Sequence, residues 1–450
     1  MREGSLEAPT RHPIPWRDDD FYDADKIDVE LRRVFDICHG CRRCFNLCDS
    51  FPRLFDLVDA ADSGEVEGVA SADFKQVVDA CTLCDLCFMT KCPYVPPHEF
   101  DLDFPHLMLR YRAAEFRAKG LSFVKKQLTE TDRNGKLAAP VAPIANWATR
   151  CGNNLTRPVM EAVAGIHRDA SLPKYSGKTL VAQAHARPID INRLAPAFGR
   201  KAVLYATCFA NYNNPTIGAA ARKVLARNGV ECEVVYPRCC GMPQLEYGDL
   251  ARVAEGARQT AMDLRPWIDK GYDVITLVPS CSLMMKFEWP LIEPEDENIA
   301  LLSRATFDAA EYIVDIHRKE GLAGGMKPVR GGVTVHIACH ARAQNMGQKA
   351  AEMLKLLPDT KIEVIERCSG HGGSWGIMKE NFEVALKVGR PVARQAKENG
   401  TEFVVSECPL ARDHIVQGME RVGAESGITH GDDRKAVSHP IEILALAYAP

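Results

Sequence analysis

Eight cysteines between residues 37 and 92 constrain this chain more than any other feature of its sequence. They form two runs in which three cysteines are separated by two residues each and a fourth follows: Cys38, Cys41, Cys44 and Cys48, then Cys81, Cys84, Cys87 and Cys92. Three thiolates at this spacing can turn inward from one tight loop onto one cubane cluster, and the distant fourth usually completes the other cluster of the pair. We therefore predict two ferredoxin-type [4Fe–4S] clusters, one bound by Cys38, Cys41, Cys44 and Cys92 and the other by Cys48, Cys81, Cys84 and Cys87.

The main alternative for these cysteines is a pair of zinc sites. Structural zinc sites usually combine C-x2-C units across a longer loop, whereas each run here has three cysteines in close succession. The chain has 17 cysteines in all, and in the cytoplasm thiols stay reduced, so short repeated spacings indicate metal ligands before disulfides. The pattern favours iron–sulfur clusters, and a non-redox scaffold with structural metal stays as the alternative.

The composition limits which cellular compartment and which kinds of binding partner we expect. The 450 residues are enough for two or three domains, and no stretch of roughly 18 apolar residues stands out as a membrane span. Residues 1–30 are charged and lack an apolar core for export, so we expect a cytoplasmic protein. The 56 basic and 60 acidic residues leave a net charge of -4, which argues against nucleic acid as a partner.

The C-terminal half contains an internal duplication. From Lys201 onward, short apolar runs alternate with helical stretches, a pattern typical of α/β units with parallel strands. Runs at 202–206, 230–236 and 274–278 lead to Cys208, to Cys239 and Cys240, and to Cys281, and runs at 333–337, 362–365 and 403–405 lead to Cys339, Cys368 and Cys408. The offsets are 131 (339 − 208), 129 (368 − 239) and 127 (408 − 281), so we predict two α/β repeats at 201–329 and 330–450.

Cysteines at the ends of parallel strands should converge on one site in each repeat, because these ends face the ligand crevice of an open sheet. Adjacent cysteines such as Cys239 and Cys240 do not easily bind one corner of an undistorted cubane, but they can bridge irons in a more open cluster. Gly241 would let the backbone pass close to it. We predict a third cysteine-bound redox site from Cys208, Cys239, Cys240 and Cys281, with buried structural cysteines as the alternative.

The second repeat is expected to differ from the first. It offers Cys339, Cys368 and Cys408, but Ser369 stands where the first repeat has Cys240, and a hydroxyl is a far poorer iron ligand than a thiolate. The neighbouring histidines His340 and His371 are further candidates to complete a metal site there. At four irons per cluster, we expect about 12 irons per chain rather than about 16.

The segment between the cysteine-rich regions has a different character. We divide the N-terminal half into an extension at 1–36, a two-cluster domain at 37–100 and a helical linker at 101–200. Within the linker, apolar and basic residues alternate in a helical rhythm over 107–126, and Pro140, Pro143 and Pro158 follow. Such a helix usually covers a core, and its basic face also allows contact with a membrane surface.

Several strings together resemble the heterodisulfide-reductase-related family of CCG-domain proteins, and within it the iron–sulfur C subunits of anaerobic glycerol-3-phosphate dehydrogenases. Beside the two N-terminal runs, they are Leu172-Pro173-Lys174-Tyr175-Ser176, Cys208-Phe209-Ala210-Asn211-Tyr212-Asn213 and Cys239-Cys240-Gly241. The resemblance implies unusual non-cubane [4Fe–4S] clusters at CCG motifs and electron flow from a partner flavoprotein to quinone or another acceptor. The second repeat departs from the family pattern at Ser369 and after Cys408, where Pro409, Leu410 and Ala411 follow instead of another cysteine.

These observations predict the fold class and the function. We expect an α+α/β chain, with a helical two-cluster ferredoxin domain followed by two homologous α/β CCG-type repeats that face each other. No G-x-G-x-x-G fingerprint for flavin or nicotinamide is present in the sequence, so two-electron chemistry should belong to a partner redox subunit. The predicted function is electron transfer, and the alternative is a reductase of disulfides or small thiols at the Cys208, Cys239, Cys240 and Cys281 site.

Overall fold

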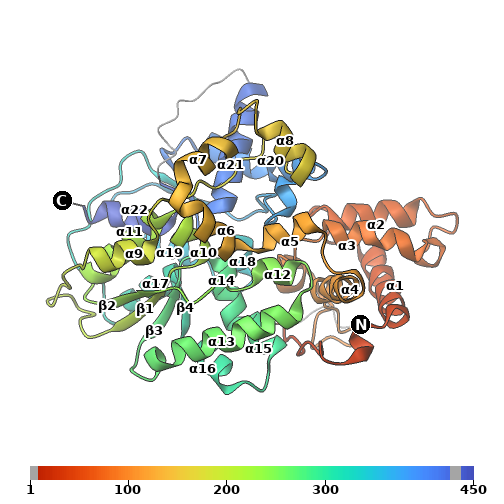
Figure 1. Cartoon of the computed structure of the whole chain (residues 1–450), viewed down its shortest axis with the longest axis horizontal. Coiled ribbons are helices and arrows are strands. Elements are labelled where there is room, and N and C mark those ends of the chain that lie inside the picture. Colours follow the sequence, from red (N-terminus) through yellow and green to blue (C-terminus); the bar gives the residue numbers. More distant parts are fainter. Residues whose placement is uncertain (1–8, 426–436, 450) are drawn as a thin grey trace.

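The N-terminal part of the molecule is helical and stands beside an α/β body (Figure 1). The structure is a computed structural model that describes residues 9–425 and 437–449. The N-terminal helices are η1 (Asp19–Tyr22), α1 (Ala24–Cys41), α2 (Ser50–Asp59), η2 (Val66–Gly68), η3 (Ser71–Asp73), α3 (Phe74–Ala80) and α4 (Phe104–Lys119). Their apolar faces share one core, in which Phe35 packs edge-on against Phe74 at 5.1 Å and Phe51 lies 4.7 Å from Phe104.

The middle of the chain is a series of short helices. They are α5 (Phe123–Thr129), α6 (Thr131–Ala138), η5 (Ala139–Val141), α7 (Ala142–Thr149), α8 (Arg157–Ala164) and α9 (Leu180–Ala186). The helix expected across 107–126 is divided at Gly120, whose φ of 65° ends α4. Pro140, Pro143 and Pro158 occupy first turns, where a missing N–H costs nothing, so the prolines of this segment begin helices.

The first α/β repeat has a four-stranded parallel sheet in the order β2-β1-β3-β4. Its strands are β1 (Lys201–Tyr205), β2 (Glu231–Val235), β3 (Asp273–Thr276) and β4 (Thr306–Asp308), and its longer helices are α11 (Pro215–Arg227), α13 (Leu250–Ile268), α16 (Glu297–Ala305) and α17 (Ala309–Lys319). Successive side chains of β1 enter two cores, with Val203 on one face and Leu204 on the other. Both faces of the sheet are therefore covered.

The second repeat has a three-stranded parallel sheet in the order β6-β5-β7. It consists of β5 (Val333–His336), β6 (Ile362–Ile365), β7 (Phe403–Ser406), α19 (Lys349–Leu354), η7 (Trp375–Ile377), α20 (Phe382–Asn399), α21 (Pro409–Glu425) and α22 (Pro440–Ala447). The order matches β2-β1-β3, which confirms the predicted α/β duplication. The prediction missed β4, because a three-residue strand has too short an apolar pattern to be recognised.

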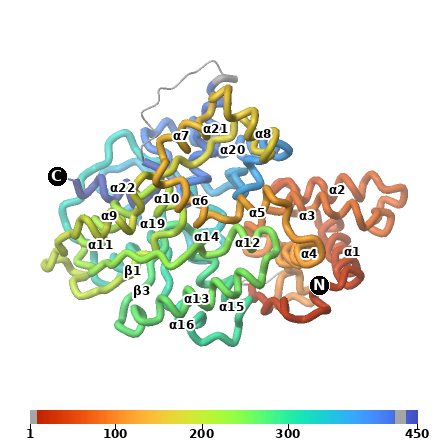
Figure 2. The backbone as a smooth tube through the Cα atoms, viewed as in Figure 1, coloured from red at the N-terminus to blue at the C-terminus, as the bar shows by residue number. Residues whose placement is uncertain are grey.

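Short helices follow the strands and hold the cysteines of the repeats. They are α10 (Cys208–Tyr212), α12 (Met242–Glu246), α14 (Pro279–Leu283), the π-helical η6 (Met284–Glu288), α15 (Trp289–Ile292) and α18 (Cys339–Arg342). The backbone tube shows α14 near the centre of the molecule (Figure 2), and this helix of the first repeat contacts α18 of the second. Among the described residues, no helix is both long and apolar enough to span a bilayer.

Candidate functional site

Four N-terminal cysteines lie together at the end of α1, and we call Cys38, Cys41, Cys44 and Cys92 the outer group. Burial raises the pKa of Cys38 well above its ordinary value, and the neighbouring Cys92, Cys44 and Cys41 raise it further. Arg42, with a left-handed φ of 50°, ends α1 and turns the chain back toward Cys44. Cys92, from the second run, thus lies near the cysteines of the first run.

The inner group consists of Cys48, Cys81, Cys84 and Cys87. Burial raises the pKa of Cys87, and the facing thiols of Cys84, Cys81, Cys48 and Cys44 add to the effect. The outer and inner groups are therefore neighbours, through Cys44 and Cys87. Within the inner loop, Leu83 and Asp85 have left-handed φ values of 48° and 62°, the alternation that turns backbone N–H groups toward one concave side.

Backbone N–H groups point at the sulfur atoms of both N-terminal groups. Cys81 receives a hydrogen bond from the backbone of Leu83, and Cys84 receives one from Leu86. The Cys48 sulfur receives hydrogen bonds from the backbone of Ser50 and Phe51. Such bonds favour a negatively charged sulfur, and they lower pKa values that burial raises.

The first-repeat group is Cys208, Cys239, Cys240 and Cys281. The sulfur atoms of Cys208 and Cys239 lie 3.9 Å apart, and Cys240 and Cys281 are 96% buried. Hydrogen bonding with the Cys208 and Cys240 thiols lowers the pKa of Cys239. Hydrogen bonding with Cys239, and burial, raise the pKa of Cys208 and Cys240. Gly241 has a φ of 87°, which only glycine adopts without strain, and this turn directs the chain into α12.

An acidic side chain from the linker completes the surroundings of this group. Asp132, in α6, accepts the backbone N–H of Cys239 at 2.8 Å and the hydroxyl of Tyr236. Burial raises the pKa of the Asp132 carboxyl group. Sequence reasoning did not find Asp132, since nothing in the local pattern of α6 indicates that it reaches a loop more than 100 residues away.

The second-repeat group is Cys339, Cys368 and Cys408. Burial raises the pKa of Cys339 to about 12, with contributions from Cys368 and Cys408, so the three thiols lie together. Gly370 donates its backbone N–H to the Cys368 sulfur at 3.4 Å. Ser369 is 93% buried and accepts a hydrogen bond from the backbone N–H of His371.

The inner and second-repeat groups adjoin each other. The pKa of Cys84 is raised by burial and then by Cys339, Cys48 and Cys368. Cys368 also contributes to the raised pKa of Cys48. The second repeat is therefore the part of the α/β body whose cysteines lie nearest to the inner group, a proximity that spacing along the chain did not indicate.

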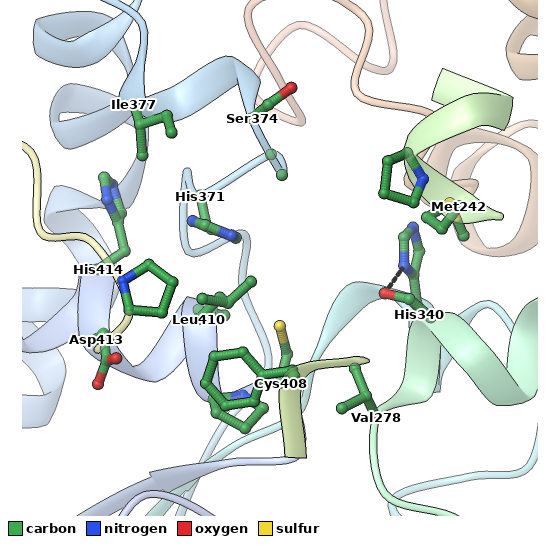
Figure 3. Close-up of a pocket in the computed structure, with 18 of the residues that line it drawn as sticks. Met242, Val278, His340, His371, Ser374, Ile377, Cys408, Leu410, Asp413 and His414 are labelled. Carbon is green, nitrogen blue, oxygen red and sulfur yellow. Dashed lines mark hydrogen bonds between the residues drawn. The ribbon is translucent and has the colours of Figure 1, made fainter. Parts of the chain in front are cut away.

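One cavity of about 380 Å³ connects three of the four groups. Its wall includes Cys84 of the inner group together with all the cysteines of the first-repeat and second-repeat groups. The close-up shows Cys408, Leu410 and Val278 at one side and Met242 and His340 at another (Figure 3). Both repeats therefore present their strand ends to the same space, as predicted from the duplication.

The two candidate histidines of the second repeat differ in their surroundings. The ring nitrogens of His340 are both engaged, Nδ1 with the Ser280 hydroxyl at 2.8 Å and Nε2 with the Leu83 carbonyl at 3.3 Å. His371 lines the cavity, and its buried Nε2 has no hydrogen-bond partner in the structure. The same holds for Nε2 of His414, which the sequence pattern did not single out. The ring of His414 hydrogen-bonds the backbone of Ala385.

These surroundings suit iron–sulfur clusters. Groups of buried thiols face one another, and burial disfavours their negative charge, so a cation is needed to hold them as thiolates. Backbone N–H groups directed at sulfur are the contacts that tune such a cluster. No set of three or more His, Cys, Asp or Glu side chains within 9–425 and 437–449 converges at the geometry of a single metal ion. Thiolates that share a cluster bind different irons and need not converge on one point.

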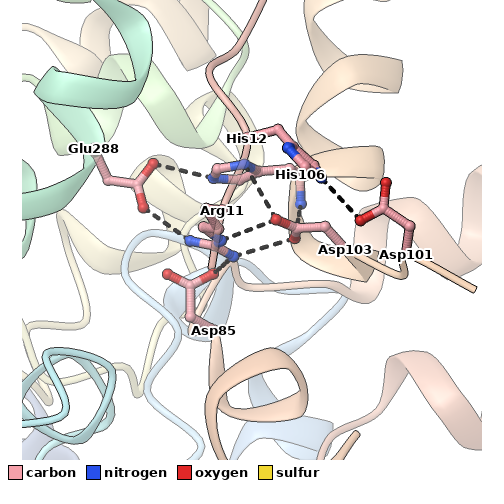
Figure 4. Close-up of polar contacts among 7 residues, drawn as sticks. All are labelled: Arg11, His12, Asp85, Asp101, Asp103, His106 and Glu288. Atoms are coloured by element: carbon pink, nitrogen blue, oxygen red, sulfur yellow. Dashed lines mark hydrogen bonds and ion pairs between the residues drawn. The ribbon is translucent and has the colours of Figure 1, made fainter. Parts of the chain in front are cut away.

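A buried ion network joins the inner loop to the first repeat. Arg11 pairs with Asp85 at 2.7 Å, Asp103 at 2.9 Å and Glu288 at 3.0 Å, and His106 contacts Glu288 at 3.2 Å (Figure 4). Although burial and Arg11 oppose its protonation, Asp103 and Glu288 raise the pKa of His106. Asp85 lies between Cys84 and Cys87, so this network fixes the inner loop against η6.

Tandem cysteine-rich domains with CCG-type loops at their strand ends are the class of protein that these repeats resemble. The CCG cysteine-rich domain family matches residues 202–286 and 333–410, one match in each repeat. This match confirms the resemblance to CCG-domain proteins inferred from the sequence.

Among curated proteins, the chain is similar to the C subunit of the anaerobic glycerol-3-phosphate dehydrogenase of Escherichia coli strain K12. The two are 26% identical over 336 residues, which covers 72% of this chain and 76% of the relative. It is also 27% identical to the B subunit of the CoM/CoB fumarate reductase of Methanothermobacter marburgensis, over 56% of this chain and 47% of the relative. An uncharacterized iron–sulfur protein of Methanocaldococcus jannaschii is 26% identical over 57% of this chain and 48% of the relative.

Proposed function

We propose that the chain is an iron–sulfur electron-transfer subunit that passes electrons between a partner redox subunit and an acceptor. The two N-terminal groups would hold [4Fe–4S] clusters within residues 37–100, and the first-repeat group would hold a third, non-cubane cluster. These clusters would supply one-electron redox chemistry. The observation that carries the proposal is the unbroken series of cysteine groups, with Cys44 beside Cys87 and Cys84 beside Cys339 on the wall of the cavity.

The partner would be a flavoprotein or another redox subunit that docks on the N-terminal helices. Two of the similar proteins are named as subunits of a dehydrogenase and of a reductase, which supports a role within a larger complex. Electrons would enter at the outer group, because Cys41 and Cys44 lie at the tip of α1, farther from the cavity than Cys84. They would then pass through the inner group to the cavity.

The acceptor would be a quinone or a protein group that enters the cavity. At the second-repeat end, the unpartnered Nε2 atoms of His371 and His414 can hydrogen-bond the oxygens of a small acceptor. Leu410 and Ile377 offer apolar contact for its ring. A second candidate function is reduction of a disulfide or small thiol in this cavity, favoured by the position of all four cysteines of the first-repeat group on its wall.

Peripheral contact with the inner face of a membrane would bring a quinone within reach. In the helix first expected to make this contact, Arg112 of α4 donates hydrogen bonds to the carbonyls of Cys81 and Glu246, whereas Arg117 and Lys119 are exposed. The apolar exposed face lies at α8 and the turn before it, where Leu155, Val159 and Val163 follow a helical spacing and are 74%, 59% and 72% exposed. We propose that this face enters the headgroup region of an anionic membrane.

Co-sedimentation with anionic vesicles tests the membrane proposal. Val159→Glu should abolish binding, whereas Val29→Glu, at a similarly exposed apolar site on α1, should leave binding intact. Equal binding by both variants and the unchanged chain would exclude α8 as the contact.

Anaerobic spectroscopy tests the main proposal. The purified protein should be brown, contain about 12 irons and, when reduced, show two interacting cubane signals. Cys92→Ser should damage the outer cluster more than the inner one, because Cys92 lies in the outer group. Colourless protein that contains only zinc would refute the proposal, and damage confined to the inner cluster would refute the exchange of ligands between the two runs.

Activity measurements separate the two candidate functions. An electron-transfer subunit should show dehydrogenase activity only when its partner is added. Turnover of disulfides by the isolated chain with a reduced dye would instead favour the reductase. Stoichiometric flavin in an active isolated chain would contradict both.

A further inference from the structure

One histidine connects three of the cysteine groups. His340 directly follows Cys339 in α18, so its backbone belongs to the second repeat. Its ring contacts the carbonyl of Leu83, the residue before Cys84, and the hydroxyl of Ser280, the residue before Cys281. Figure 3 draws a hydrogen bond of the His340 ring as a dashed line.

The two contacts engage both nitrogens of the ring. A carbonyl oxygen can only accept, so Nε2 of His340 carries a proton that it donates to Leu83. Nδ1 contacts the Ser280 hydroxyl, which donates to it when the ring is neutral. Neither nitrogen is therefore free to bind a metal.

We infer that His340 is a positioning residue that sets the rate of electron transfer between the inner group and the first-repeat group. The inference rests on the proposed function. The continuous route runs from Cys84 through the Leu83 carbonyl, the His340 ring and the Ser280 hydroxyl to Cys281, and its only non-covalent steps are the two hydrogen bonds. With clusters bound at both groups, one electron would leave the inner centre, which would be oxidised, and reduce the first-repeat centre, and the His340 ring would neither gain nor lose a proton.

A purely structural role explains His340 less well. Other hydrogen bonds already hold α14 against α18, because Gln344 donates to the Ser282 hydroxyl at 2.9 Å and to the Pro279 carbonyl at 3.3 Å. The equivalent position in the first repeat, 131 residues earlier, is Phe209, so the repeat itself does not need an imidazole after its first cysteine. What the imidazole adds is the link to Leu83 and Ser280.

The test compares His340→Phe with His340→Gln in the whole chain with its clusters. Phenylalanine fills the space without hydrogen bonds, whereas the amide of glutamine can donate to Leu83 and accept from Ser280. Ser280→Ala removes one bond and leaves the ring in place. His336→Phe is the matched control, since His336 is also buried and bridges a serine hydroxyl, Ser406, and a carbonyl, Arg367, but lies wholly within the second repeat.

The readouts are iron content, the reduction potential of each centre and the rate of electron transfer from the inner to the first-repeat centre after rapid photoreduction. We expect His340→Phe to slow this transfer by about tenfold or more at unchanged iron content. Ser280→Ala should also transfer electrons more slowly than the unchanged chain. His340→Gln should transfer them at the normal rate. His336→Phe should transfer at the normal rate. If His340→Phe does not accumulate, Ser280→Ala and His340→Gln give the same comparison.

Normal transfer in His340→Phe or in Ser280→Ala, with all clusters present, would overturn the inference and leave the proposed function intact. Slowing by His336→Phe to the same extent would also overturn it, because the effect would then follow from any broken buried histidine bridge. Absence of iron from the first-repeat group of the unchanged chain would instead refute the proposed function, and the inference with it.

Discussion

The two α/β repeats share a strand order but differ where a cluster would bind. In the first repeat, Cys240 is buried beside Cys239 and Cys281, and Asp132 reaches in from the linker. In the second, Ser369 takes the place of Cys240, and the cysteines lie against the inner N-terminal group. The comparison teaches that two copies of one fold can differ in role. The first repeat, with four thiols, is suited to hold a cluster, and the second, with three, is suited to contact the inner N-terminal group.

The largest expected effect comes from making the first repeat resemble the second. Cys240→Ser should remove the third cluster, because a hydroxyl replaces a thiolate, and iron should fall from about 12 to about 8 per chain. Ser369→Ala is the control and should leave the count unchanged. Iron and sulfide analysis of anaerobic protein provides the measurement, and a Cys240→Ser chain that keeps its full count would contradict the difference between the repeats.

The reverse change sharpens the comparison. Ser369→Cys restores a fourth thiol beside Cys339, Cys368 and Cys408, and we expect the count to rise toward about 16 irons. An unchanged count would show that the second repeat differs from the first in more than this residue. A count near the higher value before any substitution would show that the repeats are not unequal.

The next effect concerns the ion network that joins only the first repeat to the inner loop. Position 288 of the first repeat corresponds to Ile415 of the second, 127 residues on, which is buried and apolar. Arg11→Met would leave buried carboxylates unpaired, and we expect a loss of about 3–5 kcal/mol in the free energy of unfolding. Arg17→Met is the control, because its pair with Glu293 has an arginine that is 57% exposed and is expected to contribute less than about 1 kcal/mol.

Chemical denaturation followed by far-UV circular dichroism and visible absorbance measures both variants. The N-terminal helices should separate from the first repeat at lower denaturant in Arg11→Met than in the unchanged chain. Equal midpoints for Arg11→Met and Arg17→Met would contradict the importance of the buried network.

A smaller effect, on reduction potential, is expected from Asp132, the carboxylate beside the first-repeat group. Asp132→Asn removes a negative charge beside Cys239, so reduction of that centre becomes easier and its potential should rise by roughly 60 mV or less. Glu130→Gln is the matched control, because this neighbouring carboxylate pairs with Arg252 at the surface. Potentiometric titration should show the N-terminal centres unmoved in both variants, and a shift confined to those centres would contradict the assignment of Asp132.

The smallest effect is a pH dependence of the same network. The pKa of His106 is raised in the folded state, so its contribution is complete below the ordinary histidine value near 6.5 and is lost as pH rises through the raised value. The pKa of Glu288 is lowered to about 2, so its contribution is present above the ordinary carboxyl value and is lost as pH falls toward 2. Arg11 stays charged throughout, which keeps the change modest.

Unfolding midpoints between pH 5 and 9 provide the measurement. Stability of the N-terminal part should decline on the alkaline side, and His106→Gln should flatten that decline. A decline of the same steepness in His106→Gln would show that another group controls it.

The sequence alone predicted most of the elements that depend on local pattern. The strand runs and the duplication followed from periodicity and spacing, because parallel strands at a constant offset repeat a regular pattern in the sequence. The pairing of Cys92 with the first run was predicted from cluster chemistry and stays a prediction, and in the structure the Cys92 thiol lies near Cys38. β4 and the break at Gly120 were missed, since their signals are only a few residues long.

What the sequence by itself determined was which residues carry the chemistry: thiols, in groups set by short spacing and repeated at a constant offset. Only the tertiary structure decided how these groups meet. The placement of Cys84 beside Cys339, the reach of Asp132 to Cys239 and the bridge from Leu83 through His340 to Ser280 join residues between 60 and 257 positions apart. Contacts at such separations depend on how helices and sheets pack, and packing leaves no periodic mark on the residues that it brings together.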